Sequence, residues 1–519
     1  MNPALLWSPV SAIGLASCLW IFPQWRRGIY LFNIAVPFAG AISLLLYPAV
    51  WPRVGKEIFI ILPTYVAFIC VWRKSKAVPT LPRSILWPTL LLVCIVLLEC
   101  LNPRRPDWGV LLIGVKTWLF ALPLILLGNL LLEERSDLPR FLRPMVLLAW
   151  IPLGVAWIQY VGSQVYGYEK TMQKFYGEAA AGATQLFARF PLGGGTIYRI
   201  PSTFTFPSQY YNYLLCLLMA TYSLGQLDDS RGWRRFSMIT FYAVIFSSYL
   251  AGVRAAYVLT PFYVGVLYGL DRGFLQAVKI TVISLALMFV ALKLPGIQME
   301  LHRHVQSGPN ISQPKAHSLP PPQAQTPAPA SPKLISIPLS ASLKQAIATP
   351  AVLSKATVGR GRDFGIDLGQ WEIMMQYCVT HYPKEIAYEG IKQGILEAPL
   401  GFGPGVNTGA SRYARSNDQW HAFENYYAKT VYELGIPGLL AIGWLFGSVL
   451  SGGFRLRKSL NDVKIRSFGV AILTLILLYV IYNFKGWLID LDPINTYFWL
   501  FIGILFALPK LSQMRPIRP

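Results

Sequence analysis

Two side chains that can accept a proton, His421 and Glu424, stand three residues apart shortly before an apolar run. If this part of the chain is helical they share a face, because residues three apart are neighbours on a helix. An imidazole or a carboxylate placed there can act as general base toward a hydroxyl group. Neither residue needs a catalytic role to be explained. His421 can be an ordinary surface histidine, and Glu424 can be a carboxylate that the positive end of the helix dipole stabilises. Both interpretations stay open, and we expect any chemistry in the surrounding stretch, residues 388–440.

Two arginines are candidate ligands for an anion. Arg199 precedes Pro201 and Pro207, which fix extended or turn conformations close to an apolar run. A guanidinium can bind phosphate oxygens through two parallel hydrogen bonds, although contact with lipid headgroups is the alternative for Arg199. Arg254 stands where two apolar runs meet without a polar linker. A charge in that place is costly unless it has a partner or lines a wet cavity, which favours function for Arg254.

Further cations are secondary candidates for binding phosphate or an acidic glycan. Lys116 lies in an apolar run, where an ionisable side chain is costly and suggests function, but it stands near the end of the run, where it can also reach water. The other candidates are Arg360, Arg362 and Arg412. The glycines of residues 399–405 let backbone N–H groups approach a ligand, but one such turn does not by itself specify phosphate binding.

The elements that must position these residues are membrane helices. The chain has 519 residues, of which 54% are hydrophobic and 13% charged, and its apolar residues fall in long runs. A bilayer core about 30 Å thick takes about 20 apolar residues per helix, and about 13 such runs are present. We predict an all-α integral membrane protein, a polytopic bundle of about 12 to 14 transmembrane helices with a large extracytoplasmic loop. The six cysteines favour neither a disulfide framework nor a zinc site, because all but Cys378 fall in apolar runs.

The formal net charge of +22 lies largely in short loops between the runs. If the runs alternate in direction, the clusters of lysine and arginine fall on one side, namely residues 26–27, 73–83, 231–235, 455–466 and 510–518. The positive-inside rule makes that side the cytoplasm, and this explains the charge better than a nucleic-acid surface does. The C-terminus is then cytoplasmic, and the loops at 163–208 and 296–430 lie outside.

This topology divides the chain into three parts. Residues 1–295 form an N-terminal transmembrane bundle, residues 296–430 the large outer loop, and residues 431–519 C-terminal transmembrane helices with a cytoplasmic tail. Within the loop, residues 305–358 are rich in Pro, Ala, Ser and Gln, a composition that favours disorder. Residues 359–430 regain aromatic side chains, and we expect this part to be ordered and catalytic.

Several segments together resemble the O-antigen ligase and O-antigen polymerase superfamily of bacterial envelope glycan enzymes. The succession EAPLGFGPG and then ENYYAKTVYELGIPGLL resembles that family's P-x-G-x-G-x-G-like turn, its His-Asn or Glu-Asn pair and its E-x-G-x-x-G motif. RIPSTFTFPSQYYNYL is similar to its arginine-bearing segment, and AGVRAA to its Ser-Arg-Gly-Ala junction, with Val253 in place of serine. The matches follow the family's order and cover the chain from about residue 108 to 508.

The resemblance implies a membrane glycosyltransferase that moves a glycan from undecaprenyl diphosphate to an acceptor sugar hydroxyl, with inversion and without a metal or other cofactor. In such enzymes arginines hold the diphosphate, a role that the resemblance gives to Arg199 and Arg254. Glu424 takes the place of the ligases' histidine before Asn425, and His421 lies three residues earlier. This departure favours a polymerase-like member and makes Glu424 the first candidate for the base and His421 the second.

The resemblance also implies the bacterial inner membrane as location. The expected partners are a lipid-linked glycan donor, a glycan acceptor, the lipid bilayer and other proteins of polysaccharide assembly and export. The competing class is a transporter, for example a flippase for lipid-linked glycans, which internal repeats and broken helices near the membrane midplane would mark. The sequence shows no convincing repeat. A scaffold role suits the Pro-rich segment but leaves the arginines unexplained.

Overall fold

The computed structural model describes residues 3–47, 49, 52–75, 81–185, 189–192, 195–306, 388–409, 411 and 425–514, and within them it consists of helices and one two-stranded sheet. The first elements are α1 Pro3–Ile21, α2 Arg26–Leu45, α3 Pro52–Lys56, the π-helix η1 Glu57–Ile61, α4 Leu62–Ser75, α5 Arg83–Glu99, α6 Trp108–Leu119, α7 Leu124–Leu131, α8 Asp137–Leu148 and α9 Trp150–Tyr166. The next are α10 Tyr168–Tyr176, α11 Glu178–Gln185, β1 Arg189–Leu192, β2 Gly195–Tyr198, α12 Pro207–Leu227, α13 Arg231–Leu250, α14 Ala256–Arg272 and α15 Phe274–Gln306. The last are α18 Glu389–Glu397, α19 Tyr426–Ser459, α20 Val463–Tyr482, the 3-10 helix η6 Leu488–Asp490 and α21 Ile494–Gln513. Except for its first two residues, the Pro-rich segment 305–358 lies outside the described residues.

Eight helical segments among the described residues are long and apolar enough to cross a membrane. They are Arg26–Leu45, Pro52–Arg73, Trp108–Leu131, Asp137–Tyr166, Phe274–Leu292, Tyr426–Ser459, Val463–Tyr482 and Ile494–Gln513. Large apolar side chains face outward, with Leu98, Leu112 and Leu440 being 65%, 65% and 67% exposed, as is usual where a surface meets lipid. These features are those of a helical membrane protein. The count of 12 to 14 membrane helices stays a prediction.

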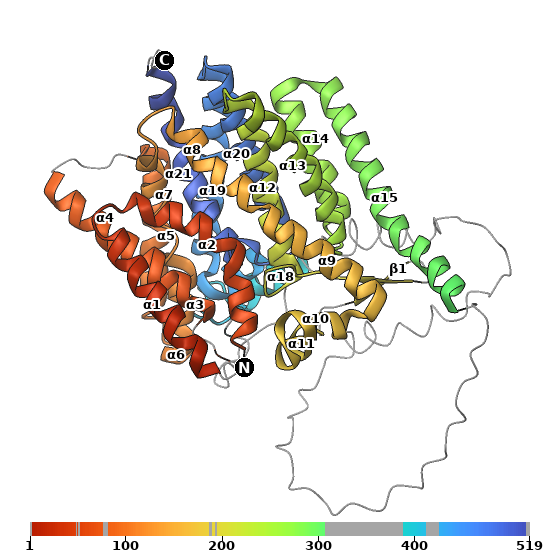
Figure 1. Cartoon of the computed structure of the whole chain (residues 1–519). Helices are drawn as coiled ribbons and strands as arrows, with labels where there is room; N and C mark the ends of the chain where they lie inside the picture. The colour runs from red at the N-terminus through yellow and green to blue at the C-terminus, as the bar shows by residue number, and fades with distance from the viewer. Residues whose placement is uncertain are drawn as a thin grey trace, which may run out of the picture.

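Ion pairs join the loops that the alternation of apolar runs assigns to one side. The pairs are Arg26–Glu133, Arg135–Asp462 at 2.9 Å, Arg143–Asp228 at 2.7 Å and Lys464–Asp229 at 2.5 Å. They connect the start of α2 to the α7–α8 loop, that loop to the α19–α20 loop, and the α12–α13 loop to α8 and to the start of α20. In Figure 1 the loop between α19 and α20 lies at the end of the bundle where the chain also ends. We call this end of the bundle the C-terminal end. The predicted inner loops therefore lie together.

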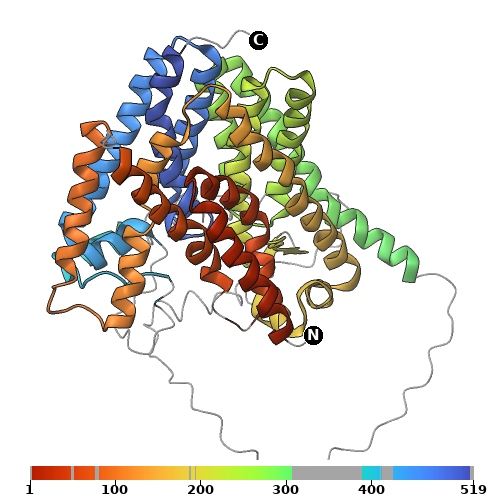
Figure 2. The same cartoon turned by 60° about the vertical axis from the view of Figure 1, so that its left-hand side comes forward.

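The opposite end of the bundle carries α10, α11, the β1–β2 hairpin and α18, as both views show (Figures 1 and 2). We call it the α18 end. The hairpin is antiparallel, with Arg189 paired to Tyr198. The loops that alternation assigns to the outer side contact one another here. Examples are Asn102 Nδ2, which donates to the Gly401 carbonyl at 3.1 Å, and Lys56, which pairs with Asp492 at 3.1 Å.

Helix α12 lies in the interior of the bundle, against α8, α13, α20 and α21. Pro207 begins it, a position where the missing N–H breaks no helical hydrogen bond. Its side chains are buried along nearly the whole length. The hydroxyl of Tyr210 donates to Ser247 Oγ at 3.1 Å, and that of Tyr211 lies 3.2 Å from Thr260 Oγ1, so its polar groups bond to α13 and α14. This rigid helix comes directly after the segment that carries Arg199.

Candidate active site

The segments that carry Arg199 and Arg254 lie side by side at the α18 end. The Ile200 N–H donates to the Ala251 carbonyl at 3.2 Å. Gly252 has φ +66°, and a Cβ there would lie 2.6 Å from a carbonyl oxygen of the Arg199 segment, so the close approach needs glycine. Arg199 is half-buried and Arg254 is exposed. The α13–α14 loop and the segment before α12 thus bring two predicted anion ligands into one region.

Ser202 anchors the chain just after Arg199. It is fully buried and has φ +54°, a conformation uncommon outside glycine. Its hydroxyl donates to the Pro152 carbonyl at 2.6 Å, and its own carbonyl accepts from Gln159 Nε2 at 3.1 Å and from the Tyr176 hydroxyl. Burial raises the pKa of Tyr176, which keeps this hydroxyl protonated and able to donate. Helices α9 and α10 therefore fix the path of the Arg199 segment.

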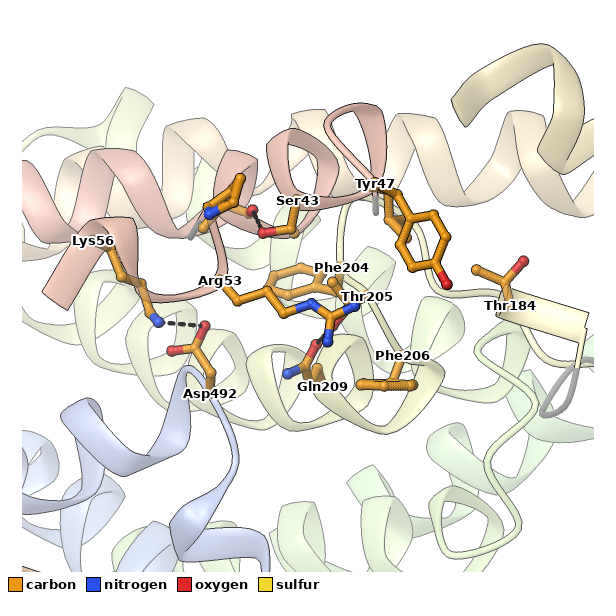
Figure 3. Close-up of a pocket in the computed structure, with 14 residues that line it drawn as sticks. Ser43, Tyr47, Arg53, Lys56, Thr184, Phe204, Thr205, Phe206, Gln209 and Asp492 are labelled. Atoms are coloured by element: carbon orange, nitrogen blue, oxygen red, sulfur yellow. Dashed lines mark hydrogen bonds and ion pairs between the residues drawn. The ribbon is translucent and has the colours of Figure 1, made fainter. Parts of the chain in front are cut away.

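A pocket of about 410 Å³ opens beside this segment (Figure 3). It lies between α2, α3 and residues 204–209. Its polar and charged lining includes Ser43, Arg53, Lys56, Thr205, Gln209 and Asp492. Small-molecule sites typically have volumes of roughly 300–1,000 Å³, so the pocket is large enough for a ligand group.

A chain of ion pairs runs from this pocket to Lys116. Lys56 lies 3.1 Å from Asp492 and 3.6 Å from Glu57, and Glu57 in turn lies 2.5 Å from Lys116. Burial raises the pKa of Asp492, and the Lys56 ammonium opposes that rise. Lys116 is thus engaged with a carboxylate and is not among the residues that line the pocket. Its predicted contact with a substrate anion stays a prediction.

The glycine-rich turn at residues 399–405 packs on a break in α19. The Phe402 N–H donates to the Tyr432 carbonyl at 2.8 Å, and the Gly403 N–H donates to the Glu433 carbonyl at 3.1 Å. In return, the Ile436 N–H donates to the Pro399 carbonyl at 2.9 Å. These N–H groups are bonded to helix carbonyls instead of facing a ligand. The turn therefore serves to dock the preceding segment onto α19.

Two buried charges of α19 were not among the residues predicted from the sequence. The Glu433 carboxylate accepts from Trp118 Nε1 at 2.6 Å, from the Asn407 N–H at 2.9 Å and from Thr408 Oγ1 at 2.9 Å. Lys429, one turn earlier, pairs with Asp490 at 2.6 Å and lies 4.3 Å from the Trp118 ring. These contacts join α19 to α6, to the segment after the glycine-rich turn and to η6. Charge within an apolar run is the sequence signal that marks Glu433, whereas Lys429 lies just before that run.

Five predicted site residues lie outside the described residues. They are Arg360, Arg362, Arg412, His421 and Glu424. The described chain resumes at Asn425, whose Oδ1 accepts from the Tyr427 N–H at 2.8 Å and the Ala428 N–H at 3.2 Å, and so caps α19. The assignment of the base to Glu424 or His421 stays a prediction.

Among the residues that the structure describes, no three or more His, Cys, Asp or Glu side chains gather as a possible ligand set for a metal ion. At the α18 end Lys56 pairs with Asp492 and Lys116 with Glu57. The chain matches no family model and no curated protein.

Proposed function

We propose that the protein is a membrane glycosyltransferase that moves a glycan from undecaprenyl diphosphate to an acceptor sugar hydroxyl, as in O-antigen or exopolysaccharide polymerisation or ligation. The observation that supports this most is the contact between the two arginine-bearing segments through the Ile200 N–H and the Ala251 carbonyl. Two guanidinium groups from distant parts of the chain can then reach one diphosphate. The site lies at one end of an apolar bundle, where the lipid tail of a donor can remain among the helices while its sugars reach water.

In the proposed reaction the acceptor oxygen attacks the anomeric carbon of the donor sugar from the side opposite the diphosphate, and the configuration inverts. The bond between the anomeric carbon and the diphosphate oxygen breaks, and its electron pair leaves with the diphosphate. Arg199 and Arg254 stabilise the negative charge that grows on this leaving group, as fixed donors do in an oxyanion hole. The hydroxyl proton passes to Glu424, with His421 as the second candidate.

Single substitutions in a strain that lacks its own copy test the arginines. We expect Arg199→Ala and Arg254→Ala each to lower the amount of long-chain envelope glycan about 100-fold or more, because each removes a preorganised donor from the leaving group. Arg254→Lys also impairs transfer, since an ammonium cannot bind two phosphate oxygens in the same way. Arg235→Ala, an exposed arginine of α13 near the C-terminal end, is the matched control and keeps full glycan length.

Mass analysis of the glycans, with immunoblots of the membrane fraction, gives the readout. Unchanged chain length in both alanine variants contradicts the proposal. Glu424→Gln is the corresponding test of the base, and loss of transfer with normal protein amount is the expected result. Purified protein in vesicles distinguishes a transferase from a flippase. A transferase joins a lipid-linked donor to an added acceptor when both are on the same side of the membrane, whereas a flippase forms no such product.

A further inference from the structure

Arg53 is a cation with no partner among the described residues, and it faces the pocket. It extends from α3 toward Thr205 and Gln209, whereas Lys56, one turn later, turns to Asp492 on the other side (Figure 3). No described residue forms a hydrogen bond or an ion pair with the Arg53 guanidinium. The charge of Lys56 is compensated, because Asp492 and Glu57 lie 3.1 and 3.6 Å from its Nζ. The pocket therefore offers one uncompensated positive charge.

The rest of the lining suits a sugar ring. Tyr47 and Phe206 supply aromatic surface, and Ser43 and Thr184 supply hydroxyl oxygens. Binding sites for small molecules combine apolar and aromatic walls with a few placed polar groups in this way. Aromatic faces cover the C–H side of a sugar, and the Ser43 and Thr184 hydroxyls, which donate to the Ala39 and Ala181 carbonyls, can accept hydrogen bonds from its hydroxyl groups. A neutral sugar needs no guanidinium, so the arginine points to an acidic one.

The size of the charge favours a carboxylate over a phosphate monoester. A carboxylate carries one negative charge, which Arg53 alone balances through a two-pronged hydrogen bond. A phosphate monoester carries nearly two negative charges, and the second would be left to face the Asp492 carboxylate on the far side of the same pocket. Four of the lining residues, Phe204, Thr205, Phe206 and Gln209, follow Arg199 closely along the chain.

We propose that this pocket binds an acidic sugar residue of the glycan substrate, with the carboxylate on the Arg53 guanidinium. This assignment rests on the proposed function and adds the substrate class, a glycan that contains a uronic acid. Arg53 is a binding and specificity residue in this scheme, distinct from the arginines that hold the diphosphate.

The test is direct binding of soluble sugars to the detergent-purified protein, measured by calorimetry. Probes are a disaccharide that carries glucuronate, the matching glucose disaccharide, and glycerol phosphate as a phosphate monoester. We expect the acidic disaccharide to bind roughly tenfold tighter than the neutral one, the size of effect that a charge-assisted hydrogen bond gives. Arg53→Ala abolishes this preference, Arg53→Lys keeps part of it, and Arg104→Ala, an exposed arginine outside the pocket at the same end, leaves it intact.

Equal affinity for the two disaccharides, or a preference that survives in Arg53→Ala, overturns the assignment. Tighter Arg53-dependent binding of glycerol phosphate than of the acidic disaccharide also overturns it, because the occupant is then a phosphate. A thermal unfolding midpoint equal to wild type shows that the Arg53 variants are folded. The transfer assay is scored separately, so wild-type protein that shows the sugar preference but no transfer activity refutes the proposed function and leaves the pocket assignment standing.

Discussion

At the residue scale, Lys429 is fully buried and forms an ion pair with Asp490. Removing one member of a buried ion pair leaves the other uncompensated and costs about 3–5 kcal/mol, whereas apolar replacement of both is often neutral. We expect Lys429→Met to lower the thermal unfolding midpoint of the purified protein strongly. The double variant Lys429→Met/Asp490→Leu restores most of the loss. Equal destabilisation in the two proteins argues that packing around Trp118 matters more than charge.

Single-residue chemistry is partly predictable from the sequence. Arg199 and Arg254 stand out because of their prolines and apolar surroundings, and their segments do meet in the fold. Lys116 stands out by the same rule, yet it pairs with Glu57, a partner that no spacing in the sequence indicates. Arg53 has no signal at all, since it lies in a short link between two apolar runs. Arg53 becomes part of a pocket because residues 204–209, distant in the sequence, line the same cavity as α3.

At the element scale, the break in α19 at Gly435 decides where the glycine-rich turn can dock. Gly435 has φ +65° and ψ −167°, a region that is essentially restricted to glycine. A Cβ there would lie 2.5 Å from the Leu400 carbonyl carbon. We expect Gly435→Ala to reduce the yield of folded protein and lower its unfolding midpoint, because the turn must move or the helix must straighten.

Gly443→Ala is the matched control in the same helix. Apart from the neighbouring backbone of the helix itself, no atom of the described residues lies within 4 Å of a Cβ at that position, so the substitution is tolerated and improves the intrinsic helix propensity. Size-exclusion profiles and thermal unfolding of the two variants give the comparison. Similar behaviour of both proteins contradicts the idea that the break holds the turn.

Helix positions can be predicted well from the apolar runs, but some of their ends cannot. The run near 209–227 corresponds to α12, Pro207–Leu227, and the run near 467–487 to α20, Val463–Tyr482. In contrast, α19 begins at Tyr426, before the run near 431–451. Its first turn is polar and aromatic but buried against protein, so hydropathy does not mark it. The docking of the turn on α19 also escapes the sequence, because it rests on backbone hydrogen bonds.

At the scale of the whole molecule, the alternation of apolar runs predicts which loops gather at each end, and labelling can test which end faces the cytoplasm. In a variant without the six native cysteines, Leu400→Cys at the α18 end and Lys458→Cys near the end of α19 each supply one exposed thiol. We expect a membrane-impermeant maleimide added to intact spheroplasts to modify Leu400→Cys alone. Lys458→Cys reacts after lysis, as the positive-inside rule requires. The opposite pattern would place the candidate site in the cytoplasm and contradict the proposed donor.

The alternation of apolar runs does not predict which helices pack against one another. Hydropathy alone does not distinguish one apolar helix face from another as a packing partner. Helix α12 occupies the interior, and its polar side chains bond to α13 and α14, so other helices solvate it in place of lipid. Because such a helix contacts protein instead of lipid, it can carry as many polar side chains as a buried helix of a water-soluble protein. A strict hydrophobicity threshold can then leave out the central member of a bundle even where its apolar residues form a recognisable run, and α12 is absent from the eight described segments that pass such a threshold.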